Sequence, residues 1–210
     1  MTMSASRNPW DDDYLHRGRL WGGSTPSLPQ LSGSSRILEL GCGDGKTVSS
    51  LVRAGCSVTA FDLSRHALSL CKNACPDPDR VSLLIADTRQ IPFRDESFDG
   101  IIASHIAGHL SLAGRHQLAC EVRRLLIPGG MMYFRDFSIL DFRFGRGEET
   151  EAGTFLRKNG IATHYFTDDE VQSLFTRFEI QSLVQHQWEM RVRGRIFMRA
   201  EIVADYEKPA

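Results

Sequence analysis

The fold of this 210-residue chain is decided by the stretch Ile37-Leu38-Glu39-Leu40-Gly41-Cys42-Gly43-Asp44-Gly45. Its apolar first half predicts a short buried strand, and its second half predicts a loop with glycine at every other position. Alternate glycines let a backbone turn tightly and approach a ligand more closely than any Cβ would allow. Residues 45–54 then carry apolar side chains at helical spacing, and Gly55 closes that segment. Strand, glycine loop and helix in this order predict the first unit of an α/β fold.

The rest of the chain continues the alternation. We predict strands at 57–61, 81–86, 98–103 and 131–134, helices at 64–72 and about 113–126, a turn at 128–130 and a helix starting near residue 167. Such alternation predicts a parallel sheet with helices on both faces. Two extended stretches, 178–186 and 195–204, are joined only by residues 187–194, so we expect an antiparallel hairpin at the sheet edge.

Composition limits the function classes. A hydrophobic share of 41% and a charged share of 24% are typical of a globular domain. The formal net charge of -1 excludes a global basic field that would draw the chain onto nucleic acid or membrane. We expect no membrane span, no signal peptide and a cytoplasmic location, which the odd set of five cysteines also fits. We divide the chain into an N-terminal segment, 1–35, and a single domain, 36–210.

Two other glycine-loop motifs each lack one required residue. A dinucleotide fingerprint G-x-G-x-x-G beginning at Gly41 requires glycine where Lys46 stands, and one beginning two residues later requires glycine where Val48 stands. A phosphate-binding loop G-x-x-x-x-G-K-[ST] fits Gly45-Lys46-Thr47 but requires glycine in place of Leu40. Both motifs therefore lose a required residue.

Acidic residues at the ends of three predicted strands favour a nucleoside ligand. Asp62 ends the second strand about 20 residues after the glycines, where a carboxylate can accept from both ribose hydroxyls. Asp87 ends the third strand, and Glu39 lies in the first strand beside the loop. Alternatively, each residue caps the next helix, as Asp62 before Ser64 suggests. Together they indicate a nucleoside pocket at one edge of the sheet.

These residues belong to a longer pattern that resembles the class I S-adenosylmethionine-dependent methyltransferases. The resemblance covers about residues 36–135 and rests on Glu39-x-Gly41-x-Gly43-x-Gly45, Asp62, Ala86-Asp87-Thr88-x-x-Ile91-Pro92-Phe93, Ser97-Phe98-Asp99 and Leu126-x-Pro128-Gly129-Gly130. It implies a Rossmann-like, seven-stranded, mostly parallel sheet whose last strand is antiparallel. It also implies that the glycines line the methionine part of the cofactor, that Asp62 binds ribose, and that Asp87 and Thr88 flank adenine. The cofactor-binding residues that we predict are Glu39, Gly41, Cys42, Gly43, Gly45, Asp62, Leu63, Asp87, Thr88 and Ser104.

In this fold the methyl group points to the segment after the fourth strand, here Ser104-His105-Ile106-Ala107-Gly108-His109. Methyl transfer from a sulfonium is an in-line displacement that depends mainly on positioning and needs at most a modest base. We therefore predict that His105 contacts the substrate or accepts a proton. The alternative is that both histidines only pack around the cofactor. A metal at the i, i+4 pair His105 and His109 is not expected, because no third ligand is evident.

The N-terminal segment is rich in aromatic residues for an irregular stretch. Trp10, Tyr14 and Trp21 suggest a lid whose rings cover the cofactor and exclude water. Alternatively, the segment is a strap that only packs on the sheet.

A narrower resemblance covers about residues 134–175. Phe134-Arg135-Asp136-Phe137, Leu140-Asp141-Phe142-Arg143-Phe144 and Thr163-His164-Tyr165-Phe166-Thr167-Asp168-Asp169-Glu170 are similar to the methyltransferase-like enzymes that make 3-methylcytidine in transfer RNA. Arg135 and Asp136 are thus candidate catalytic residues beside the acceptor; the alternative is an internal salt bridge. Two arginine-rich groups are either phosphate contacts or solvated surface. They are Arg143, Arg146, Arg157 and Lys158, and Arg191, Arg193, Arg195 and Arg199.

Three functional hypotheses follow. The leading hypothesis is a methyltransferase that acts on a small molecule, because the net charge is near zero and only about 35 residues precede the first strand. The rival is a tRNA cytosine methyltransferase, and the third is a non-catalytic cofactor-binding subunit. The oligomeric state is left open.

Overall fold

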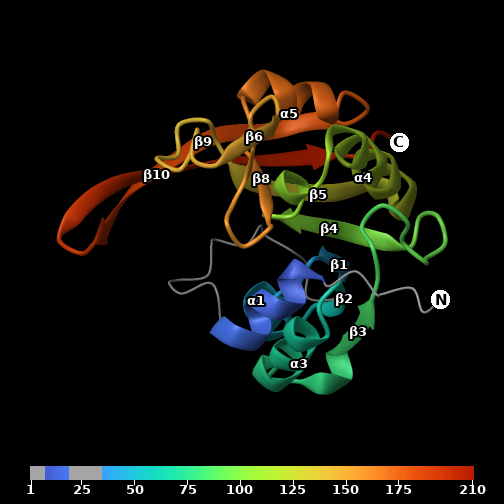
Figure 1. The fold of residues 1–210 in the computed structure, drawn as a ribbon. Coiled ribbons are helices and arrows are strands. Elements are labelled where there is room, and N and C mark those ends of the chain that lie inside the picture. Colours follow the sequence, from blue (N-terminus) through green and yellow to red (C-terminus); the bar gives the residue numbers. More distant parts are fainter. Residues whose placement is uncertain (1–7, 19–34) are drawn as a thin grey trace, which may run out of the picture.

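The computed structural model describes residues 8–18 and 35–210. A seven-stranded sheet with the order β3-β2-β1-β4-β5-β10-β9 forms the centre (Figure 1). Neighbouring strands from β3 to β5 pair in parallel, whereas β10 is antiparallel to both β5 and β9. The predicted mostly parallel sheet with an antiparallel last strand is therefore confirmed. The strands are β1 (Arg36–Leu40), β2 (Ser57–Asp62), β3 (Val81–Ile85), β4 (Phe98–Ser104), β5 (Leu126–Phe137), β9 (Glu179–Val192) and β10 (Arg195–Glu207).

Helices cover both faces of the sheet because successive strand residues point to opposite sides. In β1, Leu38 packs with Leu118 in one apolar layer, and its neighbour Ile37 packs with Val48 in the other. Figure 1 shows α1 and α3 on one side of the sheet and α4 and α5 on the other. The α-helices are α1 (Pro9–Arg17), α2 (Lys46–Arg53), α3 (Arg65–Ala74), α4 (Leu112–Leu125) and α5 (Asp168–Leu174); the 3-10 helices are η1 (Pro78–Arg80) and η2 (Ala107–His109). None of the helices in the two described ranges is long and apolar enough to cross a membrane.

The strand order places a ligand site between β1 and β4. The chain runs from β1 outward through β2 to β3, and then returns to place β4 on the other side of β1. Loops that leave the two central strands therefore diverge, and this switch point is where open α/β sheets bind ligands.

Three parts of the fold differ from the sequence expectation. Helix α1 lies in the segment expected to be irregular; Pro9 starts it and the Asn8 side chain accepts from the Trp10 amide. A second, three-stranded sheet fills the insertion after β5. Strand β5 also continues through the expected turn at 128–130. The second sheet consists of β6 (Glu148–Glu151), β7 (Thr154–Leu156) and β8 (Ala162–His164).

The edge hairpin is confirmed, but its expected connection at 187–194 is wrong. Strand β9 continues to Val192, and only Arg193 and Gly194 turn the chain into β10. Both turn residues have positive φ, 48° and 77°, which matches the backbone of tight two-residue hairpins. Arginine is an unusual first residue for such a turn, so the residue types at 193–194 did not predict that the two strands extend this far. The ribbon projects from the body of the domain (Figure 1).

Candidate active site

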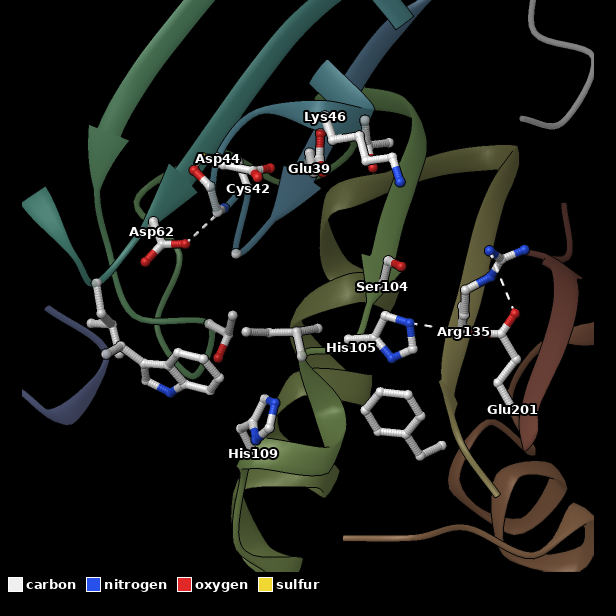
Figure 2. A pocket seen from close by; sticks show the side chains of 18 of the residues that line it. Glu39, Cys42, Asp44, Lys46, Asp62, Ser104, His105, His109, Arg135 and Glu201 are labelled. Carbon is white, nitrogen blue, oxygen red and sulfur yellow. Dashed lines mark hydrogen bonds and ion pairs between the residues drawn. The ribbon is translucent and has the colours of Figure 1, made fainter. Parts of the chain in front are cut away.

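One cavity of about 600 Å³ begins at the loop after β1 and reaches β5, β9 and β10. Figure 2 shows Asp62 at one end of this pocket and Glu201 at the other, with Ser104 and His105 between them. We call the part beside the glycine loop and Asp62 the cofactor end, and the part beside Arg135 and Glu201 the acceptor end.

Eight of the ten predicted cofactor residues line the cavity, namely Glu39, Gly41, Cys42, Gly43, Asp62, Leu63, Thr88 and Ser104. Gly45 instead starts α2, with a φ of 79°. The Asp87 carboxylate forms an ion pair with Arg89 and accepts from the Arg89 backbone N–H at 2.9 Å. The structure therefore places the Asp87 carboxylate against its own loop rather than on the cavity wall.

The glycine loop holds a conformation that side chains other than glycine adopt at a cost. Gly41, Gly43 and Gly45 have φ values of 66°, 52° and 79°, in the left-handed region. A Cβ on Gly43 would lie 2.5 Å from the Tyr14 hydroxyl, and one on Gly41 would lie 2.7 Å from Ile106 Cδ1. The loop backbone thus forms part of a cradle that a larger residue would fill.

Asp62 connects the loop to the next strand. Its Oδ2 accepts from the Gly43 N–H and its Oδ1 from the Ser64 N–H, both at 2.9 Å. Burial raises the pKa of Asp62, although these backbone N–H groups oppose the shift. The true N-cap of α3 is Ser64, whose Oγ accepts from the Ala67 amide. Asp62 therefore orders the loop while its carboxylate lines the cavity.

Glu39 provides an unsatisfied acceptor at the same end. The residue is 4% exposed, and its Oε2 has no hydrogen-bond partner among the described residues. Burial, together with the neighbouring Cys71 thiol, raises the pKa of Glu39 well above its usual value. A buried acceptor of this kind is costly unless a ligand donates to it. The ammonium group of S-adenosylmethionine is such a donor, so the residues present fit this cofactor.

His105 lies where the two ends of the cavity meet. Its φ of 53° is unusual for a residue other than glycine, and its ring stacks on Phe137 with centroids 4.3 Å apart. Nε2 lies 3.5 Å from Glu201 Oε2, and Nδ1 lies 3.8 Å from Asp136 Oδ1. Burial lowers the pKa of His105, but the two carboxylates outweigh burial and raise it above the usual value. This environment favours the imidazolium, which is a poor proton acceptor.

Arg135 and Asp136 point to different surroundings. Arg135 lines the cavity and pairs with Glu201, at 3.5 Å. Asp136 is fully buried and does not line the cavity; it accepts from the Gly108 and Phe137 amides at 2.7 and 2.9 Å. This placement does not support contact between the Asp136 carboxylate and a substrate; the carboxylate lies 3.8 Å from His105 Nδ1 instead.

The second histidine is held apart from the first. His109 Nδ1 interacts with the Ala162 carbonyl oxygen at 2.7 Å, and burial lowers the pKa of the ring. Its ring meets Trp10 edge-on, with centroids 4.6 Å apart. Within the described ranges, no group of three or more His, Cys, Asp or Glu residues is arranged to hold a metal.

Helix α1 attaches to the cofactor end through polar contacts. Asp11 accepts from the Ser64 hydroxyl at 2.7 Å and pairs with His66 at 3.0 Å. Trp10 and Tyr14 line the cavity. The position of these two rings is compatible with the expected lid, whereas Trp21 lies outside the described residues.

Comparison with known proteins decides the class. Residues 38–134 match the family model described as a methyltransferase domain. The chain contains a methyltransferase domain. An S-adenosylmethionine-dependent methyltransferase from Methanosarcina mazei superposes with a TM-score of 0.71 at 26% identity, covering 85% of this chain and 94% of that one. These findings confirm the predicted enzyme class and its cofactor, S-adenosylmethionine.

Curated relatives extend the match into the C-terminal part. The tRNA N(3)-cytidine methyltransferase METTL2 of Gallus gallus is 33% identical over 203 residues, which are 89% of this chain and 55% of that protein. The O-methyltransferase 3 of Dictyostelium discoideum is 28% identical over 172 residues, 76% of this chain and 39% of that protein. This methyltransferase domain thus spans about half the length of the METTL2 relatives.

The structure adds acceptor-end residues that the sequence did not single out for the site. They are Phe137, His186, Trp188, Met190 and Glu201, which line the cavity together with Arg199. Most come from the β9–β10 hairpin, where Glu201 lies opposite His186 in register. The available signal was the alternation of β10, because a carboxylate between the apolar residues Ala200 and Ile202 faces away from the core.

Each of the two arginine-rich groups contains both covered and exposed side chains: Arg146 and Lys158 of the first group are exposed, and Arg199 of the second is buried. Arg143 and Arg199 each pair with Asp141 at 2.7 Å, and both guanidinium groups lie over the Phe137 ring. By contrast, three arginines at the hairpin tip are exposed, namely Arg191, Arg193 and Arg195.

Proposed function

We propose that this methyltransferase domain transfers a methyl group from S-adenosylmethionine to N3 of a cytosine in transfer RNA. The observation that carries the proposal is the 33% identity to METTL2 across 89% of this chain. That match covers much more of this chain than the general family model, which matches residues 38–134.

The chemistry of the acceptor end supports a ring nitrogen. N3 of cytosine carries a lone pair, so methylation requires no prior removal of a proton. A site for this reaction needs alignment and charge stabilisation more than a base. The raised pKa of His105, which burial alone would lower but Asp136 and Glu201 raise, suits such a site.

The hairpin supports an RNA partner through its charge. Arg191, Arg193 and Arg195 are exposed at the tip of the projecting ribbon. Arginines presented in this way bind phosphates and release counterions, which gives affinity a strong dependence on salt. This local patch needs no basic net charge of the whole chain.

A small-molecule acceptor, favoured by the near-neutral charge, is the second candidate. The 28% identity to a relative named O-methyltransferase 3, rather than for a tRNA, keeps an acceptor other than RNA open to test. A cytoplasmic location is part of either proposal.

Incubation of the protein with methyl-labelled S-adenosylmethionine tests the two candidates against each other. One sample contains bulk tRNA and the other contains a deproteinised metabolite extract. We expect label in RNA, and a lower yield when Arg191, Arg193 and Arg195 are all changed to alanine. Label confined to the metabolite sample would reject the RNA acceptor.

A further inference from the structure

A buried carboxylate lies on the wall of the acceptor end. Glu201 is 4% exposed and lines the cavity. Its neighbours Ala200 and Ile202 are fully buried, and Ile202 belongs to the apolar core on the other face of the sheet. Burial of a carboxylate is costly unless other groups compensate its charge. Its presence in an otherwise apolar part of β10 therefore calls for partners, and part of that compensation is visible in the structure.

Three side chains surround Glu201. Its Oε1 interacts with His186 Nδ1 at 3.0 Å and lies 3.5 Å from the Arg135 guanidinium. Its Oε2 lies 3.5 Å from His105 Nε2. Burial would raise the pKa of Glu201, but His105, Arg135 and His186 lower it, so the carboxylate is ionised.

The spacing of these contacts leaves capacity for a further donor. A carboxylate offers about four lone-pair sites, and ion pairs at 3.5 Å are longer than ordinary hydrogen bonds to oxygen. We expect this donor to approach from the cavity that Glu201 lines, because β10, the strand that carries Glu201, is paired on both edges, with β5 and with β9.

Other carboxylates near the cavity are placed for different tasks. Among the described lining residues, Glu39, Asp44 and Asp62 belong to the cofactor end. Asp136 is fully buried and accepts from two backbone amides. Glu201 is thus the carboxylate that the described structure presents to the acceptor.

We propose that Glu201 recognises the exocyclic amino group of the cytosine and stabilises the ring as it becomes cationic. This inference rests on the proposed function. In the transfer, the N3 lone pair forms the bond to the methyl carbon, and the electron pair of the breaking S–C bond stays on sulfur. The positive charge moves from the sulfonium to the pyrimidine, and no proton leaves. The carboxylate accepts from the amino N–H, and this hydrogen bond strengthens as charge develops.

A chemical double-mutant cycle tests the contact. The probe is a synthetic RNA stem–loop that carries either the cytidine found to be methylated or, at that position, a 2-pyrimidinone nucleoside. The analogue retains N3 but lacks the amino group. We expect the wild-type kcat/KM to fall about 10- to 100-fold on this replacement, as for loss of a hydrogen bond to a charged group.

The variants decide what causes the difference. We expect Glu201→Ala to lower kcat/KM for the cytidine RNA. The kcat/KM values of this variant for the two RNAs should lie within about threefold of each other. Glu201→Gln keeps the size of the side chain without its charge, and its discrimination should lie between those of the alanine variant and the wild type. Glu207→Gln, on the same strand, is the matched control with wild-type discrimination. Calorimetric affinity for S-adenosylhomocysteine and a thermal melt report whether each variant is folded.

The failures are distinguishable. If the wild-type protein methylates no cytosine, the proposed function is wrong and this inference falls with it. If cytosine is methylated but the folded Glu201 variants discriminate as strongly as the wild type, the inference alone is overturned. Should Glu201→Ala fail to fold, Glu201→Gln decides, and unchanged discrimination in that variant contradicts the role of Glu201.

Discussion

The two ends of the cavity are built from different materials. The cofactor end is formed largely by backbone, with three glycines at positive φ and Asp62 bonded to the Gly43 and Ser64 amides. The acceptor end is formed by side chains of β5, β9 and β10, held together by ion pairs around Glu201. Few substitutions are tolerated where backbone groups at positive φ form the wall. Where side chains form the wall, a single substitution changes the charge and hydrogen bonding that a ligand meets. We therefore propose that the loop geometry governs cofactor binding and that a few side chains govern the choice of acceptor.

The largest effect is expected from Asp62→Ala. The variant loses both the expected ribose contact and the bond that orders Gly43, so the affinity for S-adenosylmethionine should fall by about 100-fold or more. Asp87→Ala is the comparison, because the Asp87 carboxylate engages Arg89, and its effect should be clearly smaller. Isothermal titration calorimetry measures both. Equal losses in the two variants would contradict the division of the cavity.

Gly45→Ala tests the rigidity of the cofactor end. A Cβ there would lie 2.7 Å from both the Cα and Sγ of Cys71, so overpacking adds to the strain of a positive φ. We expect a loss of about 2–3 kcal/mol in the free energy of unfolding by urea denaturation. Gly145→Ala has a similar φ, 75°, with nothing within 4 Å of the new Cβ, and should lose only about 1 kcal/mol. Matching losses would mean that the packing against Cys71 is loose.

The cofactor end could be predicted from the sequence, whereas the position of Glu201 and helix α1 could not. The cofactor end uses residues close together in the chain, so local patterns predicted the glycine loop, Asp62 and Glu39 as candidates. Glu201 meets Arg135 and His105 only because β10 adds to the sheet beside β5. No local spacing reports that pairing. Helix α1 was not predicted for another reason: its residues are mostly polar, and this polarity hid the helix start that Asn8 caps.

Arg135→Ala acts at the acceptor end. Removal of the guanidinium leaves Glu201 with one positive neighbour fewer, and we expect the KM for RNA to rise about tenfold. The affinity for S-adenosylmethionine should stay within about twofold of wild type. Steady-state kinetics and calorimetry measure the two quantities. Arg135→Lys should recover part of the loss, and a parallel fall in cofactor affinity would show that the two ends are not separable.

The smallest effect concerns pH. Burial lowers the pKa of His105, but Asp136 and Glu201 raise it overall; Arg135 and His109 are its nearby basic groups. A histidine with a raised folded pKa stabilises the protein below its unfolded pKa and loses that contribution as pH rises through the folded value. The stability gap between wild type and His105→Gln should therefore be larger at about pH 6 than at about pH 9, by roughly 1 kcal/mol or less. Urea denaturation at both pH values measures the gap, and Glu201→Gln should reduce its pH dependence. A gap that grows with pH would refute the charged pair.

The most direct measurement is the identity of the methylated nucleoside. Transfer RNA is incubated with the wild-type protein and methyl-labelled S-adenosylmethionine, digested, and analysed by mass spectrometry. We predict that the label is in 3-methylcytidine and that Asp62→Ala abolishes it. Label in another nucleoside, or none in RNA while a metabolite is methylated, would contradict the assignment of the acceptor end to cytosine.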